Sequence, residues 1–270
     1  MTQLCALLGC ARSSYYYQPR QNAEAALVAA IEDVMMRWPR YGYRRILAQL
    51  HREGIETGER VVRRLLKALG GSYQVGRVRI CTTDSNHAHW RYPNLLKHLA
   101  ITHPDQAWVA DITYLRFGHR FIYLAVILDV YTRAVRGWAV SRNIDKQLTL
   151  AALQMALQQG QPLVFHSDQG VQYAAWEHTA LLAAASVQIS MADAGQPTQN
   201  AFAERFIRTF KEEHVDFADY LSFADACTQI GQWLAVTYNT LRIHSALDYL
   251  TPLEFEAAFL ERQVSRLTLV

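Results

Sequence analysis

The stretch from Trp108 to Ser141 constrains the fold more than any other, because it holds three apolar, strand-like segments with very little chain between them. Gly118 and His119 separate the first two segments, a composition that is typical of a hairpin turn. The short connections predict a meander of three strands. The three segments cover residues 108–117, 121–131 and 134–141.

Beyond this meander the pattern changes to alternating helical and strand-like runs. Apolar residues follow the helical period in two stretches and form short buried runs in two others. A meander followed by such an alternation predicts an α/β fold, a mixed five-stranded sheet flanked by helices. The helices are expected at 148–157 and 174–185, and the strands at 163–166 and 187–191.

Composition excludes several other classes of protein. Of the 270 residues 51% are hydrophobic, which is enough for a sizeable buried core. No apolar run approaches the roughly 20 residues that a membrane helix needs, and the N-terminus lacks the pattern of a signal peptide. The four cysteines show no paired spacing, which favours a reduced, cytoplasmic setting. No second cysteine lies near Cys81, His87 and His89 to complete a zinc site.

Charge is distributed unevenly along the chain. Residues 1–104 carry 15 Lys and Arg against 7 Asp and Glu, a net charge of +8, whereas residues 105–270 carry 12 against 17, a net charge of −5. A basic region joined to a mildly acidic one is typical of a nucleic-acid-binding segment attached to another domain. We therefore expect a helical DNA-binding region at 1–69, a basic linker at 70–104, and a core domain with C-terminal helices at 105–270.

Two helices joined by a short glycine-containing turn are predicted at 43–52 and 59–69. Such a pair matches a DNA-binding helix-turn-helix, in which the second helix enters the major groove. A helical hairpin with a solvated charged face explains the same pattern. A smaller helical pair is expected at residues 4–17. The second helix of the main pair carries a basic stripe at i, i+3, i+4 and i+7, formed by Arg60, Arg63, Arg64 and Lys67.

Three acidic residues in the core are candidates for one site. Asp111 interrupts an apolar strand, where an unpaired carboxylate is costly. Asp168 follows a buried strand, where ligand sites of open α/β sheets tend to form. Glu204 lies on a helix, and each acid alone has an ordinary structural explanation, so the prediction depends on the three together. The polar face around Glu204 also includes Asn200, Arg208 and Lys211.

Three converging carboxylates suit divalent metal ions. Mg²⁺ and Mn²⁺ prefer oxygen ligands and retain water. Two such ions about 3.5–4 Å apart activate a hydroxyl nucleophile and stabilise the leaving oxygen in phosphoryl transfer. We expect Asp111 to bridge two Mg²⁺ ions, with Asp168 and Glu204 each holding one, and Mn²⁺ as a substitute.

Two further acidic residues are alternatives as metal ligands. Asp129 ends a strand beside Arg133 and is expected to form a structural pair. Asp193 is expected in the loop before the helix that carries Glu204. Either becomes a ligand only if the strand register differs from the prediction.

Short motifs surround the three acids. The second and third acids are separated by 35 residues, and Lys211 follows Glu204 by seven. In this order the motifs resemble the catalytic core of bacterial insertion-sequence transposases related to retroviral integrases. More narrowly, they resemble the second-reading-frame product of elements with two overlapping frames. The motifs are Trp108-x-x-Asp111-Ile112-Thr113-Tyr114, His166-Ser167-Asp168-Gln169-Gly170-x-Gln172-Tyr173, Asn200-Ala201-x-x-Glu204, Arg40-Tyr41-Gly42-Tyr43-Arg44-Arg45-Ile46 and Tyr238-Asn239-x-x-Arg242-x-His244-x-x-Leu247.

The resemblance covers nearly the whole chain and implies a ribonuclease-H-like integrase core. It implies an Asp111-Asp168-Glu204 triad with two Mg²⁺, which cleaves element ends and joins their 3′-hydroxyls to target DNA. Lys211 would contact a DNA phosphate, and Asn200 would support Glu204 or the DNA end. The partners implied are double-stranded DNA, further copies of the chain on that DNA, and a first-reading-frame product or fusion.

The chain departs from the family in the loop 191–199. Members often carry a basic residue in this loop and an Asp where this chain has Gln199. The departure concerns the contacts of the loop with DNA and leaves the triad intact. The N-terminal zinc site of retroviral integrases is also missing from the sequence pattern.

Two other functions remain compatible with the sequence. The first is a non-catalytic DNA-binding regulator derived from a transposase, although such a protein has no chemical need for three intact acids and Lys211. The second is a Mg²⁺-dependent nuclease that cleaves ends without joining them.

Overall fold

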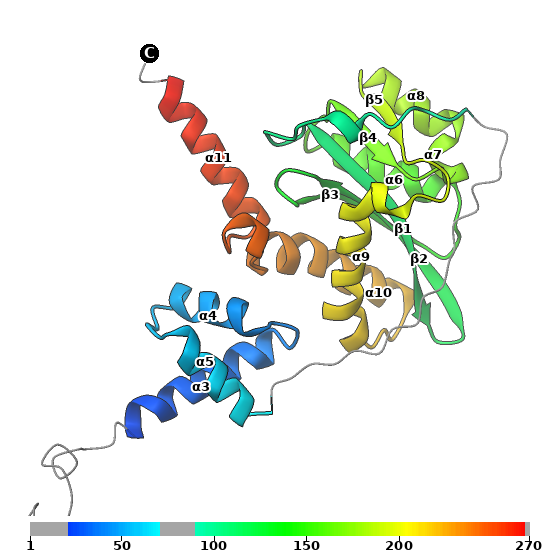
Figure 1. Ribbon diagram of the computed structural model, residues 1–270. Helices are drawn as coiled ribbons and strands as arrows, with labels where there is room; N and C mark the ends of the chain where they lie inside the picture. Colours follow the sequence, from blue (N-terminus) through cyan, green and yellow to red (C-terminus); the bar gives the residue numbers. More distant parts are fainter. Residues whose placement is uncertain (1–20, 71–89, 268–270) are drawn as a thin grey trace, which may run out of the picture. The chain divides into compact units, whose positions relative to one another are not determined.

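The computed structural model describes residues 21–70 and 90–267, and the chain divides into two compact units, Met1–Gln74 and Val75–Val270 (Figure 1). The helical pair expected at 4–17 lies outside the described residues, as do Cys81, His87 and His89. Where the chain is described, no helix is both long enough and apolar enough to cross a membrane.

Three helices make up the described part of the first unit: α3 (Gln21–Arg37), α4 (Tyr43–Arg52) and α5 (Glu59–Ala68). The predicted helix-turn-helix corresponds to α4 and α5, and Gly54, with φ at 79°, forms the turn after α4. Positive φ is accessible to glycine because it lacks a Cβ atom. Apolar side chains at helical spacing on all three helices meet in one small core, formed by Ile31, Val34, Ile46, Leu50, Val62, Leu65 and Leu66.

A mixed five-stranded sheet organises the second unit, in the order β3-β2-β1-β4-β5. β1, β2 and β3 are antiparallel neighbours, and β4 and β5 run parallel to β1. The predicted α/β fold is thereby confirmed. β2 ends two residues earlier than expected, because the chain turns at Asp129. The strands are β1 (Ala107–Phe117), β2 (Arg120–Asp129), β3 (Val135–Ser141), β4 (Val164–Ser167) and β5 (Gln188–Met191).

Helices cover both faces of this sheet (Figure 1). Alternate residues of β1 point to opposite faces, so Val109 packs with α9 and α10 while Trp108 packs with α6 and α8. α6 lies so close to β3 that a Cβ atom on Gly137 would be 2.3 Å from the carbonyl oxygen of Ala152. The helices are α6 (Lys146–Leu157), α7 (Val171–Ala174), α8 (Trp176–Ala184), α9 (Ala201–Glu213) and α10 (Phe223–Gln232).

One prediction in this region is wrong in detail. The single helix expected at 174–185 is two helices, α7 and α8, separated by Ala175, whose backbone is extended. The break lets α7 begin directly after the turn that contains Asp168.

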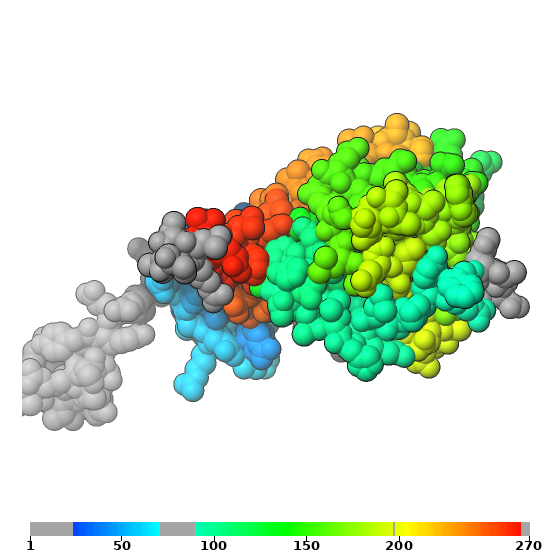
Figure 2. All heavy atoms as spheres, turned by 90° about the horizontal axis from the view of Figure 1, so that it is seen from above, coloured from blue at the N-terminus to red at the C-terminus, as the bar shows by residue number. Residues whose placement is uncertain are grey.

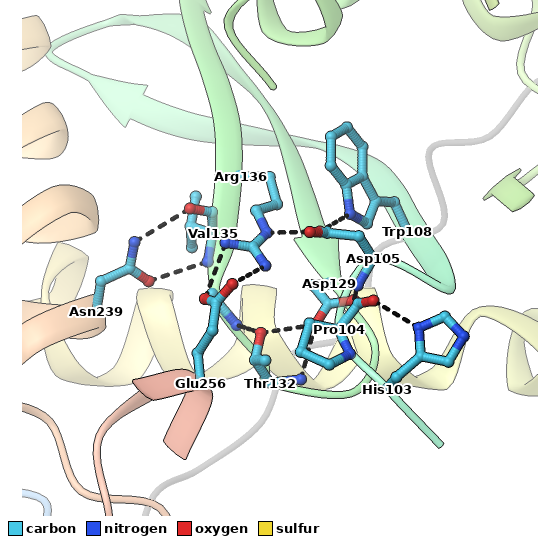
Figure 3. Close-up of polar contacts among 11 residues, drawn as sticks. His103, Pro104, Asp105, Trp108, Asp129, Thr132, Val135, Arg136, Asn239 and Glu256 are labelled. Carbon is cyan, nitrogen blue, oxygen red and sulfur yellow. Dashed lines mark hydrogen bonds and ion pairs between the residues drawn. The ribbon is translucent and has the colours of Figure 1, made fainter. Parts of the chain in front are cut away.

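The C-terminal part continues from α10 into a π-helix, Trp233–Leu241, and ends with α11 (Pro252–Leu267). A buried guanidinium attaches α11 to the sheet: Arg136 on β3 donates to both carboxylate oxygens of Glu256, at 2.7 and 3.0 Å, and to Asp105 at 2.9 Å (Figure 3). Asp105 also accepts a hydrogen bond from the indole of Trp108. Breaking a buried pair of this kind is expected to destabilise a fold strongly.

Candidate active site

The three candidate acids lie on three neighbouring elements. Asp111 is half-buried in β1, just beyond Ala107–Val109, the only residues of β1 that pair with β4 within the described chain. Asp168 directly follows β4, and its carboxylate accepts a hydrogen bond from the backbone N–H of Gly170 at 3.0 Å. Glu204 is exposed in the first turn of α9. Because β4 ends early, β1 has an open edge at the height of Asp111.

The carboxyl group of Asp111 is strongly perturbed by its surroundings. Burial raises its pKa, and the negative charge of Asp168 raises it further, to about 8. The backbone N–H of Ile112 opposes this shift, Glu204 adds to it, and the ammonium of Lys211 opposes it again. The structure therefore brings together all four of these predicted residues, Asp111, Asp168, Glu204 and Lys211, within electrostatic reach of one another.

Lys211 lies over an aromatic ring and within electrostatic reach of Asp111. Its Nζ atom lies 4.5 Å from the centre of the Tyr114 ring, a cation–π distance. Burial lowers the pKa of Lys211, and the charge of Asp111 partly restores it. Arg208, one helical turn earlier, is half-buried on α9.

Asn200 is buried, so its side chain is not placed at the surface, where a residue that contacts DNA would lie. Its side chain is only 4% exposed, and its Nδ2 atom donates to the carbonyl oxygen of Ala110 at 2.9 Å. Asn200 is also the N-cap residue of α9, although its side chain does not cap the helix. It therefore ties the start of the Glu204 helix to the residue that precedes Asp111.

Tyr173 is a functional candidate that the sequence reasoning missed. Its ring is 3% exposed, and within the described residues its hydroxyl has no hydrogen-bond partner. Burial raises the pKa of Tyr173 well above its ordinary value, and the charges of Asp111 and Asp168 raise it further. Tyr173 belongs to the same sequence motif as Asp168 and follows it by five residues. Nothing in that motif indicates that the tyrosine hydroxyl lies near the acids.

His166 belongs to the scaffold of the site. It is fully buried, and its Nδ1 atom lies 2.8 Å from the hydroxyl oxygen of Ser190 on β5. That oxygen also accepts from the backbone N–H of Leu95 at 2.9 Å. Burial lowers the pKa of His166 to about 4, so the ring is neutral at neutral pH. His166 thus fixes the end of β4, two residues before Asp168.

The loop that precedes α9 is held by a set of side-chain hydrogen bonds, which we call the loop latch: Asn94, Lys97, Asp193 and Gln199. The amide oxygen of Gln199 accepts from Asn94 Nδ2 at 2.7 Å and from the backbone N–H of Asp193 at 2.8 Å. Its Nε2 donates to the Asp193 carboxylate at 2.9 Å, and Lys97 pairs with that carboxylate at 2.6 Å. Figure 2 shows residues 90–99 on the surface beside this region.

The two alternative ligands have other partners. Asp129 is fully buried and accepts from the hydroxyl of Thr132 at 2.6 Å, from the Thr132 N–H at 2.8 Å and from the Asp105 N–H at 3.1 Å (Figure 3). Its role is structural, as expected. The charge of Asp129 acts on the guanidinium of Arg133, the expected partner, which also lies 4.0 Å from the centre of the Phe202 ring. Asp193 lies in the loop, as expected.

The basic stripe of the first unit is exposed on α5, but two of its four residues form ion pairs with acidic side chains of the same unit. Arg63 pairs with Glu59 at 3.5 Å, and Arg64 pairs with Glu24 of α3 at 2.9 Å. Exposed ion pairs of this kind contribute little to stability, so a phosphate can compete for both arginines. Arg60 and Lys67 are exposed on the same helix.

The acids do not form a compact three-ligand cluster for one metal ion. In the parts of the chain that the structure describes, no three His, Cys, Asp or Glu side chains gather closely enough to hold a single ion together. Mg²⁺ usually keeps several waters among its ligands, so it needs few carboxylates from the protein. The perturbed carboxyl of Asp111 is also a group that a cation would favour in its ionised form.

Comparisons with known proteins identify families that the chain resembles. Residues 101–197 and 185–252 match family models described as integrase core domains, and residues 21–71 match an HTH-like domain. The chain is 33% identical over 267 residues to the "uncharacterized 31 kDa protein" of insertion element IS600 from Shigella sonnei, across 95% of this chain and 98% of that protein. It is also 33% identical over 221 residues to the transposase of insertion sequence element IS904 from Lactococcus lactis, across 80% of this chain and 87% of that protein.

A likeness of fold extends to a viral assembly. The simian T-cell lymphotropic virus intasome, solved in complex with a PP2A regulatory subunit, matches with a TM-score of 0.50 at 15% identity, over 84% of this chain and 74% of that chain.

Proposed function

Because the chain belongs to the insertion-sequence transposases and is a DDE-type enzyme of the transposase and integrase class, we propose that it cleaves the ends of its element and joins their 3′-hydroxyls to target DNA by Mg²⁺-dependent phosphoryl transfer. The observation that carries this proposal is the electrostatic coupling of Asp111 to Asp168 and Glu204, which together with burial raises the pKa of Asp111 to about 8. A site with this much negative charge needs cations to keep its acids ionised at neutral pH.

Each side chain of the site has a role in this reaction. Asp111 would bridge two Mg²⁺ ions, Asp168 and Glu204 would hold one each, and Mn²⁺ would substitute. When bound, such a pair of ions activates the attacking hydroxyl and stabilises the leaving oxygen. Lys211 binds a DNA phosphate beside the reacting one. Asn200 positions β1 through Ala110 and contacts DNA at most indirectly.

The remaining basic residues would hold the DNA outside the reacting centre. We assign residues 1–69 to DNA binding, 70–104 to a basic linker and 105–270 to the catalytic core, with Arg208 near the DNA end. The exposed stripe on α5 fits the major groove as the second helix of a helix-turn-helix. Its residues are Arg60, Arg63, Arg64 and Lys67.

The reaction also implies partners. Joining two element ends in one event requires two active sites, so we propose a homo-oligomer assembled on DNA. A first-reading-frame product would act as partner or fused segment, and the enzyme would act in the cytoplasm on nucleoid DNA.

A strand-transfer assay tests the proposed function. Full-length protein is incubated with a labelled duplex of the element end, a supercoiled target plasmid and Mg²⁺, and joined products are measured. We expect Asp168→Asn and Glu204→Gln to reduce joining by at least about 10³-fold, because each removes one metal-ligand charge. Asp219→Asn, which changes an exposed acid on the same unit, serves as the control.

Other outcomes would select the alternative functions. If wild type and Asp168→Asn bind element ends equally and neither cleaves them, the protein is a DNA-binding regulator. If wild type cleaves ends but never joins them in the presence of target DNA, it is a nuclease.

A further inference from the structure

A groove of about 560 Å³ lies beside the acidic site, between the β1–β2 hairpin and the end of α9. We call it the hairpin groove. Its lining includes Tyr114, Phe121, Arg116, Arg120 and Lys211. Lys211 is shared with the acidic site, so the groove lies next to the reacting centre.

Two aromatic rings form a wall of the hairpin groove. Tyr114 and Phe121 meet edge to face, with ring centres 5.4 Å apart and planes at 90°. Phe121 is 50% exposed, although it lies at the beginning of a strand whose next residues are buried. An exposed aromatic face held rigidly by a strand is a surface on which a flat apolar group can stack.

Cations surround this aromatic wall. Arg116 and Arg120 are exposed on the two strands of the hairpin, and Arg116 is the register partner of Phe121. With Lys211 they place three positive charges around the groove, against the single acid Asp216. Proteins that bind single-stranded nucleic acid combine aromatic rings, on which bases stack, with cations that contact the phosphates.

We propose that the hairpin groove binds an unpaired nucleotide of the DNA strand next to the reacting phosphate. The base stacks on Phe121, and the flanking phosphates lie against Arg116 and Arg120. The volume suits one nucleotide and is far too small for a duplex. The inference rests on the proposed function, because it names a subsite for the DNA substrate. The nucleotide that occupies the groove must therefore be separated from its complementary strand.

Binding of a single strand tests this subsite without catalysis. Full-length protein is titrated, with EDTA present, into a fluorescein-labelled eight-nucleotide oligo(dT), and fluorescence anisotropy is measured. We expect Phe121→Ala to weaken binding at least about fivefold, since it removes one base stack. Arg120→Ala should reduce the magnitude of the slope of log affinity against log salt by roughly 0.7, the value for one phosphate contact on a single strand, and Arg120→Lys should preserve it.

Matched variants and a crosslink separate this groove from other DNA contacts. Trp176→Ala and Arg262→Ala remove an exposed aromatic and an exposed cation elsewhere on the same unit and should leave the affinity unchanged. An oligo(dT) with one 5-iododeoxyuridine should crosslink on irradiation to a peptide that contains residues 114–121. Thermal unfolding verifies that each variant folds.

Three results would overturn the proposal: unchanged oligo(dT) affinity in Phe121→Ala, a crosslink that maps only outside the hairpin, or a change of oligomeric state in Phe121→Ala without a change in affinity. The last result would make the groove an interface between copies of the chain. Because no reaction is measured, a protein that fails the strand-transfer assay can still pass this one, so the two proposals fail separately.

Discussion

At the scale of single residues, Asp111 makes the metal-free protein less stable as the pH rises. Its pKa is about 8 in the folded protein, compared with 3.8 for an ordinary Asp. Between these values the folded protein holds a proton that the unfolded chain has lost, so the free energy of unfolding falls with increasing pH. A cation at the site would reverse this effect, because it favours the ionised form.

We therefore predict that Asp111→Asn stabilises the metal-free protein at pH 8, by up to about 5 kcal/mol, and has little effect at pH 4. Asn keeps the size of the side chain and an oxygen that can accept from the N–H of Ile112. Urea unfolding in EDTA at several pH values measures the effect, with Asp219→Asn as the control. Parallel pH profiles for Asp111→Asn and wild type would contradict the assignment.

Tyr173 and His166 show why single residues of the site were only partly predictable. Both stood inside the motif around Asp168, but their roles depend on what lies next to them in space. The hydroxyl of Tyr173 is enclosed with two acids, whereas the ring of His166 is bonded to Ser190 and kept neutral. Neither environment leaves a local pattern in the sequence.

At the scale of elements, the loop latch decides how α9 begins. The loop was the one part of the catalytic core that departed from the family, and Gln199 was the residue that differed. In the structure Gln199 connects the loop to residue Asn94, far away in the sequence. The substitution therefore gives the loop protein partners at the position where a family member often has an acid.

We predict that Gln199→Ala lowers the rate of strand transfer about tenfold and leaves the affinity for element ends unchanged, because the start of the Glu204 helix loses its anchor. Amide hydrogen exchange should become faster at 192–200. The matched control is Gln196→Ala, an exposed glutamine of the same loop for which only backbone hydrogen bonds are described. Equal exchange in the two variants would show that the latch does not hold the loop.

The regular elements were the easiest to predict. Helix α4 begins and ends at the predicted residues, because its apolar side chains follow the helical period without interruption. The break at Ala175 was missed, since alanine and leucine are frequent on both sides of it and favour one continuous helix. The turn after Asp168 sets where α7 begins, and this is a tertiary constraint.

At the scale of the whole molecule, charge is distributed unevenly between the two parts of the chain. The basic surplus lies in residues 1–104, and the acids lie in the second unit. A protein that binds DNA phosphates releases counterions, so its affinity falls as the salt concentration rises. The slope of log affinity against log salt concentration is roughly −0.9 per phosphate contact on duplex DNA.

We predict that Arg60→Ala and Lys67→Ala each reduce the magnitude of this slope by roughly 0.9 for duplex DNA that contains the element end. Electrophoretic mobility shifts at several salt concentrations measure it, with Arg262→Ala on α11 as the control. Unchanged slopes would favour the helical hairpin with a solvated charged face. Arg63 and Arg64 should give smaller changes, since each loses an ion pair with Glu59 or Glu24 when it binds phosphate.

The sequence by itself determined the class of fold and the family, because side-chain period, turn residues and motif spacing are local properties of the chain. It also singled out Asp111, Asp168 and Glu204 as candidates. Only the tertiary structure decided what surrounds them: the shared charge at Asp111, the hydroxyl of Tyr173, the loop latch and the hairpin groove. Burial and electrostatic interaction depend on which distant segments pack together, and that information is not contained in any one stretch of sequence.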